Sequence, residues 1–342
     1  MDVALLKNYL SSCRELIMEE IQSIGPHNRY SPVLYDLMMD YPLRLGKGFR
    51  PALCIASSRA QGGQLQDVLR TAAVLELYHN AFLLHDDVED GSQLRRGQPT
   101  LHAQYGVPIA VNVGDAIFAL CLKPLLDNTE SLGLGKALAI LDTVARMARE
   151  SAEGQAIELN WVRHGDWMQP DRGYCHMSFK KTCWYTFIAP LRIGGIISGA
   201  SPRRMMRLQR FGSLIGVAFQ IQDDILNLIA DERLYGKEIG GDLWEGKHTV
   251  MLLHMMRSIA QSERKEAQRI LQIPRKEKSA EDIEYLFNLI RSCNSVSYAT
   301  ALARRLAQKA LAVLDGDDER IEPSVHRDFL VAMVDYVVSR SM

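Results

Sequence analysis

Residues 65–87 read "LQDVLRTAAVLELYHNAFLLHDD" and carry the strongest structural signal in the chain. Their apolar residues recur at spacings of three and four, which predicts an α-helix rather than a strand. Such a helix would be about twice as long as the average helix of a globular protein. It is also apolar on more than one face, which is typical of a helix buried inside a large bundle.

Two further stretches, residues 136–162 and 203–232, show the same periodicity, and alternating strand patterns are hard to find. Segments rich in glycine, proline and charged residues separate the helical stretches, at residues 42–51, 91–108, 163–173, 234–249 and 273–282. We find no internal repeat and no convincing linker. The sequence therefore predicts an all-α fold, a large helical bundle that forms a single domain over residues 1–342.

The composition argues against several classes of protein. A formal net charge of −1 and an isoelectric point of about 6.8 do not fit a nucleic-acid-binding protein. Six scattered cysteines without a C-x-x-C pair argue against a zinc site or a disulfide framework and favour a reducing compartment. The N-terminus is unlike a signal peptide, and no apolar run reaches the roughly 18–20 residues that span a bilayer. We expect a cytoplasmic protein without stable membrane insertion.

An acidic cluster, "HDDVEDG", ends the first helical stretch. On a helix, Asp86 and Asp90 lie one turn apart and share a face, with Asp87 beside it. His79 lies almost two turns before Asp86 on the same face. Gly91 would end the helix, which places the carboxylates at the negative end of the helix dipole. Like charges and the dipole both oppose this arrangement, whereas a Mg²⁺ ion that takes oxygen ligands would favour it.

A second acidic cluster lies in "FQIQDDILN", residues 219–227. The polar members of this stretch would share one helical face: Gln220, Asp223 or Asp224, and Asn227. Helical bundles commonly build metal sites from side chains on facing helices. Each cluster alone could be a solvated acidic helix end, so the occurrence of two clusters is what favours a metal site.

Basic residues gather in the glycine-rich breaks and at helix ends: Lys47, Arg50, Arg95, Arg96, Lys180, Lys181, Lys237 and Lys247. Arginine donates forked hydrogen bonds to phosphate, and lysine supplies a point charge. Any one of them alone could be a solvated surface residue. Together with the two acidic clusters, they predict a site for two polyphosphates, one of which is bound through metal.

The motifs, and the order in which they follow one another along the chain, resemble those of the trans-isoprenyl diphosphate synthases, the polyprenyl synthetase family. Among these, the sequence resembles the geranylgeranyl diphosphate synthases. The resemblance covers roughly residues 46–249 and rests on "GKGFRP", "HNAFLLHDDVED", "GDAIF", "GQAIE", "KKT", "FQIQDDILN" and "YGKEIGGDLWEGKHT". Two positions depart from the family pattern. Leu45 replaces a glycine before "GKGFRP", and Asn227 stands where many members carry a third aspartate.

The resemblance implies a homodimeric prenyltransferase with the class I isoprenoid synthase fold around a central cavity. It would condense isopentenyl diphosphate head to tail with an allylic prenyl diphosphate. Three Mg²⁺ ions around the allylic diphosphate would be held by Asp86, Asp87, Asp90, Asp223 and Asp224, with direct contacts from Asp86, Asp90 and Asp223. The same diphosphate would contact Arg95, Lys181, Lys237 and Lys247. Isopentenyl diphosphate would contact Lys47, Arg50, His79 and Arg96. The path of the carbocation would be lined by Thr182 and Gln220.

Product length is expected to depend on side chains near the first acidic cluster. In the family, bulk about one turn before the first aspartate helps to close the tunnel in which the product grows. Here Phe82 lies four residues before Asp86, whereas Ala81 leaves space. We expect the twenty-carbon product geranylgeranyl diphosphate, with fifteen carbons as the next alternative and longer chains as the third. Ordinary core packing explains Phe82 equally well.

Three other classes of protein remain open. A class I terpene cyclase also uses an aspartate-rich motif and Mg²⁺, but it needs no second diphosphate site of the kind that Lys47, Arg50 and His79 would form. A non-catalytic partner subunit would be expected to lose carboxylates, and here both acidic pairs remain. A generic helical scaffold leaves the matched clusters unexplained.

Overall fold

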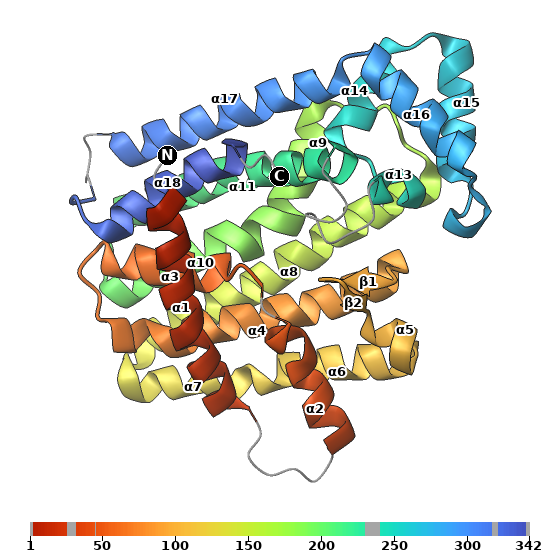
Figure 1. The fold of residues 1–342 in the computed structure, drawn as a ribbon. Helices are drawn as coiled ribbons and strands as arrows, with labels where there is room; N and C mark the ends of the chain where they lie inside the picture. Colours follow the sequence, from red (N-terminus) through yellow and green to blue (C-terminus); the bar gives the residue numbers. More distant parts are fainter. Residues whose placement is uncertain (1–2, 26–31, 45, 230–239, 317–320, 340–342) are drawn as a thin grey trace. The chain divides into compact units, whose positions relative to one another are not determined.

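The computed structural model of the chain describes residues 3–25, 32–44, 46–229, 240–316 and 321–339 (Figure 1). The chain divides into two compact units. The first unit comprises Met1–Ala148, Tyr185–Gly212 and Val313–Met333, and the second comprises Arg149–Trp184, Ser213–Ala312 and Val334–Met342. Leu45 and Lys237, two positions singled out in the sequence, lie outside the described residues.

The described part of the first unit is helical apart from one short hairpin. Its elements are α1 (Val3–Ile24), α2 (Pro32–Leu43), α3 (Phe49–Arg59), α4 (Leu65–Asp90), β1 (Leu94–Arg95), β2 (Gln98–Pro99), α5 (Leu101–Tyr105), α6 (Val107–Leu120), α7 (Leu122–Ser131), α10 (Ala189–Ser198), the first part of α8 (Leu134–His164), the first part of α11 (Pro202–Ile229) and most of α18 (Val325–Ser339). The two strands pair antiparallel. The all-α prediction is therefore confirmed.

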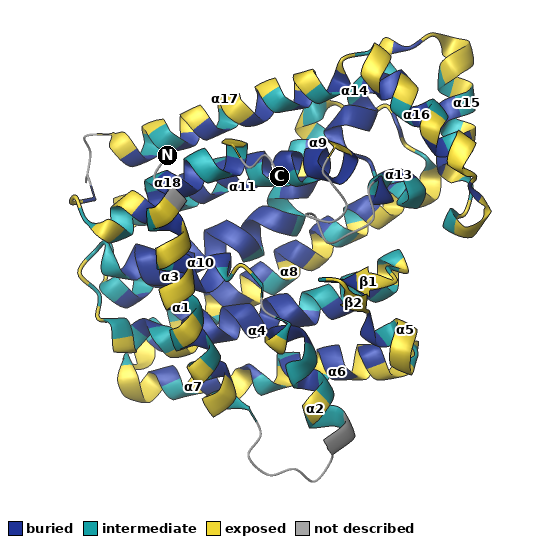
Figure 2. Cartoon of the chain, viewed as in Figure 1, coloured by how far each residue is buried: buried dark blue, intermediate teal, exposed yellow. Residues whose placement is uncertain are grey.

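Helix α4 lies at the centre of the first unit and confirms the helix predicted over residues 65–87. It packs against α1, α3, α6, α7 and α10. Every residue from Thr71 to Ala81 is buried, so all sides of this part of the helix face protein (Figure 2). Burial on all sides is what an apolar stretch without a polar face predicts.

Helices α3 and α10 pack with their backbones close together. A Cβ atom on Gly194 of α10 would lie 2.5 Å from the carbonyl oxygen of Cys54 in α3. Only glycine permits this approach at that position. The contact fixes α3, which carries Arg50, against the helix that directly follows Tyr185 and Thr186 in the chain.

The described part of the second unit is helical as well. Its elements are the remainder of α8, α9 (Asp171–Ser178), η1 (Phe179–Ile188) as far as Trp184, the remainder of α11, α13 (Gly241–Glu245), α14 (Val250–Ser258), α15 (Gln261–Gln272), η2 (Arg275–Glu277), α16 (Ala280–Ser292), most of α17 (Ser295–Asp315) and the end of α18. The segment η1 is a π-helix. Wide π turns are rare and occur often at functional sites. The sequence did not predict this one.

The unit boundaries fall inside α8, η1, α11, α17 and α18 rather than in a linker. The helices predicted over residues 136–162 and 203–232 correspond to α8 and α11, with residues 230–232 outside the described residues, and α8 continues through Gly154 without a break. A single domain over residues 1–342 stays a prediction. All six cysteines are free in the structure.

One described helical segment, Val107–Ser131, is long and apolar enough to cross a membrane by length and composition alone, and less than half of its most apolar window is buried. The search for uninterrupted apolar runs in the sequence missed this segment. A single segment of this kind is weak evidence for a membrane protein. Its exposed apolar side chains therefore need another explanation.

Candidate active site

The first acidic motif lies at the C-terminal end of α4, as predicted. Helix α4 ends at Asp90, and Gly91 follows in the left-handed conformation with φ of 65°. The amide of Ser92 donates to the carbonyl oxygen of Asp87 at 3.0 Å. Glycine is favoured at this position because a side chain would be strained there, and the resulting turn satisfies carbonyl groups at the helix end.

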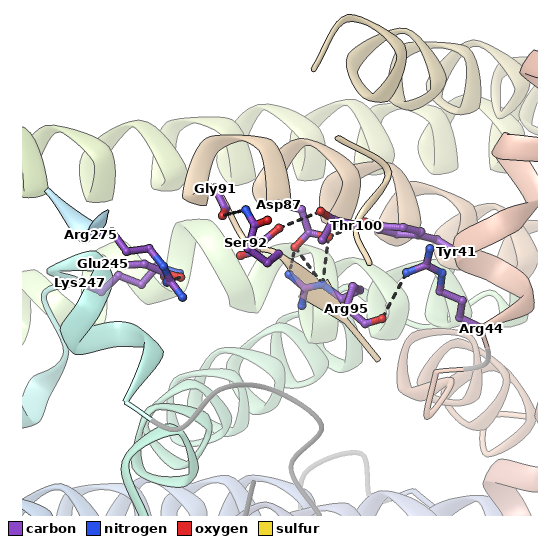
Figure 3. A network of polar contacts seen from close by, with 11 residues as sticks. Tyr41, Arg44, Asp87, Gly91, Ser92, Arg95, Thr100, Glu245, Lys247 and Arg275 are labelled. Carbon is purple, nitrogen blue, oxygen red and sulfur yellow. Dashed lines mark hydrogen bonds and ion pairs between the residues drawn. The ribbon is translucent and has the colours of Figure 1, made fainter. Parts of the chain in front are cut away.

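The three aspartates of this motif differ in their surroundings. Asp87 is fully buried and accepts hydrogen bonds from the Nε atom of Arg95 at 3.0 Å and from the hydroxyl of Tyr41 at 2.7 Å. The Nη2 atom of Arg95 also donates to Asp87 (Figure 3). Asp86 and Asp90 are only partly buried. The motif therefore combines one buried aspartate, held by several hydrogen bonds, with two aspartates that are only partly buried.

The β1–β2 hairpin places the two arginines that follow the motif. Its two-residue turn, Arg96-Gly97, has positive φ at both positions, 54° and 75°. Left-handed backbone costs a residue other than glycine about 1–2 kcal/mol. The guanidinium of Arg96 donates to the carbonyl oxygen of Tyr41 at 3.0 Å, and a Cβ on Gly46 would lie 2.5 Å from its Nη2 atom. An arginine kept at a strained position indicates that its side chain has a function.

Residues expected to bind isopentenyl diphosphate gather in the first unit. Arg50 donates to the hydroxyl of Thr186 at 2.8 Å, and its guanidinium lies 4.5 Å from the ring centre of Tyr185. His79 stacks on the same ring at 5.9 Å. Tyr185 therefore contacts both Arg50 and His79. Lys47 is exposed, with its ammonium 5.9 Å from the ring of Phe49.

A buried glutamate lies within the electrostatic reach of two of these cations. Glu76 is one turn before Asn80 on α4, and the amide of Asn80 donates to the carbonyl oxygen of Glu76 at 2.7 Å. Burial raises the pKa of the Glu76 carboxyl, and the charges of Arg50 and Arg96 oppose that rise. Sequence reasoning missed Glu76, because its apolar neighbours hid it inside a helical stretch.

Aromatic side chains surround Phe82. Its ring centre lies 5.3 Å from that of Phe118 and 5.4 Å from that of Tyr185, and Tyr78 lies 5.1 Å from Phe118. Ala81 is fully buried. Phe118 belongs to the "GDAIF" motif of α6, and the sequence did not assign it a role. The aromatic cluster of Tyr78, Phe82, Phe118 and Tyr185 packs together inside the first unit.

The second acidic motif, on α11 in the second unit, repeats the division seen in the first. Asp223 is partly buried, whereas Asp224 is buried and accepts from the hydroxyl of Tyr174 at 2.6 Å and the amide of Gln220 at 2.8 Å. Burial raises the pKa of Asp224, and the charge of Asp242 adds to the rise. The amide oxygen of Gln220 accepts from the hydroxyl of Thr182 at 2.7 Å. Thr182, Gln220 and Asp224 thus form one chain of hydrogen bonds.

Asn227 has a structural role at the end of this motif. Its side-chain oxygen accepts from the amide of Asp242 at 3.0 Å, and its carbonyl oxygen accepts from the amide of Gly240 at 2.7 Å. These bonds hold the start of α13 against α11. The amide side chain is suited to this contact because the first backbone N–H groups of a helix have no acceptor within the helix.

Glycines on two helices press against η1. A Cβ on Gly154 of α8 would lie 2.1 Å from the backbone nitrogen of Lys181, and a Cβ on Gly216 of α11 would lie 2.6 Å from the sulfur of Cys183. Lys181 forms an ion pair with Glu158, which belongs to the "GQAIE" motif. Lys180, its neighbour, pairs with carboxylates of α8, namely Glu150 and Glu153.

Lys247 lies in a small ion-pair network of the second unit. Glu245 accepts from both Lys247 and Arg275, each at 2.9 Å (Figure 3). Lys278 donates to the carbonyl oxygens of Leu243 and Trp244 at 3.1 and 2.6 Å, which satisfies the end of α13. Arg275 and Lys278 come from a charged segment whose composition predicts only a break between helices.

Both acidic motifs carry donors of the kind that magnesium prefers. Asp86 and Asp90 of the first unit and Asp223 of the second unit are only partly buried. Within the described residues, no three side chains of aspartate, glutamate, histidine or cysteine form a ready-made metal cluster. Mg²⁺ commonly uses one or two carboxylates and completes its shell with water and substrate phosphates, so separate carboxylates are sufficient.

Comparison with known proteins defines the class. The family model described as polyprenyl synthetase matches residues 32–290. The chain belongs to the polyprenyl synthetase family, whose members are prenyltransferases that make prenyl diphosphates. The prediction from the ordered motifs is confirmed.

Curated relatives differ in product. The chain is 31% identical over 331 residues to the short chain isoprenyl diphosphate synthase of Methanothermobacter thermautotrophicus, covering 96% of this chain and 97% of the relative. It is 33% identical to the geranylgeranyl diphosphate synthase of Saccharolobus solfataricus, over 78% of each chain. It is 31% identical to the octaprenyl diphosphate synthase of Escherichia coli, over 86% of each chain.

Solved structures share the fold over almost the whole chain. A geranylgeranyl pyrophosphate synthetase from Pyrococcus horikoshii matches with a TM-score of 0.87 and 29% identity, over 99% of both chains. A geranylgeranyl pyrophosphate synthase from Corynebacterium glutamicum, in complex with isoprenyl diphosphate and magnesium, matches with a TM-score of 0.87 and 26% identity. The second match covers 98% of this chain and 99% of the other.

Proposed function

We propose that this prenyltransferase condenses isopentenyl diphosphate with an allylic prenyl diphosphate in a magnesium-dependent reaction. The bond between the allylic carbon and the diphosphate oxygen breaks, and its electrons leave with diphosphate. The alkene of isopentenyl diphosphate forms the new carbon–carbon bond, and the released diphosphate takes the proton that is lost. Bound magnesium would neutralise the leaving diphosphate. The observation that carries the proposal is the pair of partly exposed carboxylates, Asp86 and Asp90, beside the buried Arg95–Asp87 pair.

Burial supports one choice of metal ligands. Asp86, Asp90 and Asp223 are only partly buried and would hold Mg²⁺, which a relative from Corynebacterium glutamicum contains together with isoprenyl diphosphate. Asp87 and Asp224 already accept several hydrogen bonds, so they would support the site from behind. We propose three ions for each site.

The two diphosphates would use different cations. Arg95, Lys181, Lys237 and Lys247 would hold the allylic diphosphate through charge-assisted hydrogen bonds. Isopentenyl diphosphate would bind Lys47, Arg50, His79 and Arg96. The second set is supported by the cluster in which Arg50 and His79 contact Tyr185 and in which Glu76 feels the charges of Arg50 and Arg96. The hydroxyl of Thr182 and the amide of Gln220 would line the path of the carbocation.

We propose geranylgeranyl diphosphate as the product. Phe82 packs against Phe118 and Tyr185, and this aromatic cluster would block further growth of the prenyl chain of the product. Relatives of similar identity make short-chain, twenty-carbon or octaprenyl products, so overall identity does not select a length. Farnesyl diphosphate is the alternative if the aromatic cluster closes the tunnel earlier, and a longer product if Ala81 opens a path past it.

We propose that α6 and α7 form the contact face of a homodimer. Their exposed apolar side chains include Val107, Ile109, Val111, Leu122 and Leu126. Clustered exposed apolar residues commonly mark an interface. An ion pair between Lys123 and Asp127 lies next to them on α7, and a bilayer would disfavour it, whereas the rim of a protein interface accommodates it. The variant Leu122→Glu/Leu126→Glu should elute as a monomer when its mass is measured by light scattering.

Product analysis tests the proposal. The purified protein is incubated with Mg²⁺, isopentenyl diphosphate and, separately, the five-, ten- and fifteen-carbon allylic diphosphates, and the products are dephosphorylated and sized. Linear prenyl alcohols are expected. Cyclic hydrocarbons would favour a terpene cyclase, and no product in any reaction would favour a partner subunit.

A matched pair of variants tests the metal site in the same assay. Asp86→Ala should reduce turnover by at least about a thousandfold, a loss in the range seen when a key electrostatic group is removed. Its helical circular dichroism should not change. Glu89→Ala removes an exposed carboxylate from the same acidic cluster and should keep normal turnover. Equal activity of the two variants would contradict the assignment of Asp86.

A further inference from the structure

In each acidic motif, a tyrosine from another helix holds the second aspartate. The hydroxyl of Tyr41, in α2, donates to Asp87 at 2.7 Å, and the hydroxyl of Tyr174, in α9, donates to Asp224 at 2.6 Å. Both tyrosines are almost completely buried. Neither belongs to a motif that the sequence singled out. The same arrangement therefore occurs once in each unit, behind a partly exposed aspartate.

Tyr41 makes the more informative contacts, because it is tied to both arginines of the hairpin. Its hydroxyl holds Asp87, and Asp87 holds the Nε and Nη2 atoms of Arg95. Its backbone carbonyl oxygen accepts from Arg96 at 3.0 Å. The connection to Arg95 depends on the hydroxyl of Tyr41, whereas the connection to Arg96 depends only on its backbone.

We propose that Tyr41 is a positioning residue that orients Arg95 for the allylic diphosphate through Asp87. This inference rests on the proposed function. An ionised carboxylate accepts at about four lone-pair sites, and Asp87 uses them on Tyr41 and on two nitrogens of Arg95. The Nη1 edge of Arg95 is not used by Asp87, and a guanidinium keeps two N–H donors on that nitrogen for a ligand.

Neighbouring contacts keep Tyr41 in place. The guanidinium of Arg44 lies 4.7 Å from the ring centre of Tyr41 and donates to the carbonyl oxygen of Arg95 at 3.3 Å. Arg44 also forms an ion pair with Asp40 at 2.6 Å. Two hydrogen bonds thus join the end of α2 and the residue after it to the hairpin, one from Arg44 to the carbonyl oxygen of Arg95 and one from Arg96 to the carbonyl oxygen of Tyr41. The ring of Tyr41 makes the packing contact with Arg44, and the hydroxyl adds the hydrogen bond to Asp87. Burial and the charge of Asp87 raise the pKa of Tyr41, so the hydroxyl keeps its proton and acts as a donor.

The test is Tyr41→Phe, which keeps the ring and the backbone carbonyl and removes only the hydroxyl. Steady-state kinetics measure KM for each substrate. We expect KM for the allylic diphosphate to rise by about tenfold, since a hydrogen bond to a charged group is lost. KM for isopentenyl diphosphate should change by less than about twofold, because the carbonyl that holds Arg96 remains. A purely structural role would change both constants together.

Tyr9→Phe is the matched control. Tyr9 is a tyrosine of the first unit whose hydroxyl bonds to His326 at 2.8 Å, outside the acidic motif. Tyr9→Phe removes this hydroxyl and with it a hydrogen bond of similar length to the one lost in Tyr41→Phe, so the thermal stability of the two variants can be compared. Neither KM should change in Tyr9→Phe. If Tyr41→Phe behaves like this control, the proposal is wrong.

Calorimetric titration with inorganic diphosphate and Mg²⁺ separates this inference from the proposed function, because it needs no turnover. Tyr41→Phe should bind inorganic diphosphate about tenfold more weakly than the wild type. If the wild type binds diphosphate but forms no prenyl product, the proposed function fails while this comparison still decides the role of Tyr41. Equal affinity of both proteins, or no binding by the wild type, would overturn the inference.

Discussion

Replacing Gly154 by alanine should damage the second unit where α8 meets η1. A Cβ on Gly154 would lie 2.1 Å from the nitrogen of Lys181, 2.5 Å from its Cα and 2.8 Å from the carbonyl carbon of Lys180. All three atoms belong to the backbone. No side-chain rotation can therefore relieve the clash, and one helix must move.

The size of the effect follows from the geometry. Ordinary contact begins at 3.4 Å, so the separation from the nitrogen must grow from 2.1 Å by 1.3 Å. Overpacking typically costs about 1–3 kcal/mol, and the upper end applies because the backbones of both α8 and η1 are involved. The higher helix propensity of alanine stabilises the helix by about 1 kcal/mol and offsets part of this cost. We expect a net loss of about 2 kcal/mol in the free energy of unfolding, which is roughly 3 °C in Tm for a chain of 342 residues.

Gly135→Ala is the control on the same helix. A Cβ on Gly135 meets nothing within 4 Å, and the residue has no positive φ. This variant should be neutral or up to about 1 kcal/mol more stable than the wild type. The two alanine variants should therefore differ by about 2–3 kcal/mol in chemical denaturation.

Turnover adds an independent readout. The displacement caused by Gly154→Ala moves the backbone of Lys181, and with it Thr182. We expect kcat to fall by about tenfold or more at a temperature at which the variant is folded, because small misplacements of positioning groups are costly. Equal stability of the Gly154 and Gly135 variants would refute the packing argument. Full kcat in a destabilised Gly154→Ala would show that η1 does not position these groups for the reaction.

Three further predictions concern other parts of the chain. Phe82→Ala should lengthen the product in the sizing assay, and an unchanged product would assign Phe82 to packing alone. Arg96→Asn should leave stability within about 1 kcal/mol of the wild type, because relief of left-handed strain offsets one lost hydrogen bond. It should nevertheless raise KM for isopentenyl diphosphate by about tenfold or more, and an unchanged KM would contradict the role of Arg96. Burial lowers the pKa of Lys278 to about 8, so between about pH 8 and pH 10 the unfolded state binds more protons than the folded state. In this range, the stability of the wild type relative to Lys278→Met should rise with pH, and a constant difference would contradict the shift.

The helical architecture could be predicted from the sequence because periodicity and burial follow from the same residues. The stretch over residues 65–87 became α4, which is buried on all sides as its composition indicated. The π-helix could not be predicted, because its register depends on close contacts with Gly154 and Gly216 from distant parts of the sequence. In sequence, Gly154 has the character of a helix breaker, whereas in the structure it permits a backbone contact within an unbroken α8.

The motifs of the candidate site could be predicted from the sequence. Which aspartates are buried and hydrogen-bonded, and which are only partly buried, could not. Helical geometry places Asp86 and Asp90 on one face and Asp87 about 100° away, so a difference was foreseeable. The partner of Asp87 could not be predicted, because Tyr41 precedes the motif by more than forty residues and belongs to no sequence motif. The same holds for Tyr174 and Asp224.

This division explains how the chain tolerates so much charge at the end of α4. The charge of Asp87 is balanced by Arg95 inside the protein, and removing one member of a buried ion pair costs about 3–5 kcal/mol. Asp86 and Asp90 are only partly buried, and there loss of a carboxylate relieves repulsion instead. Within one motif, the buried aspartate is therefore expected to support folding and, under the proposed function, the orientation of Arg95, whereas the partly buried aspartates would bind the metal. Substitutions at Asp86 and Asp87 should consequently differ in kind, since only the second should lower the free energy of unfolding.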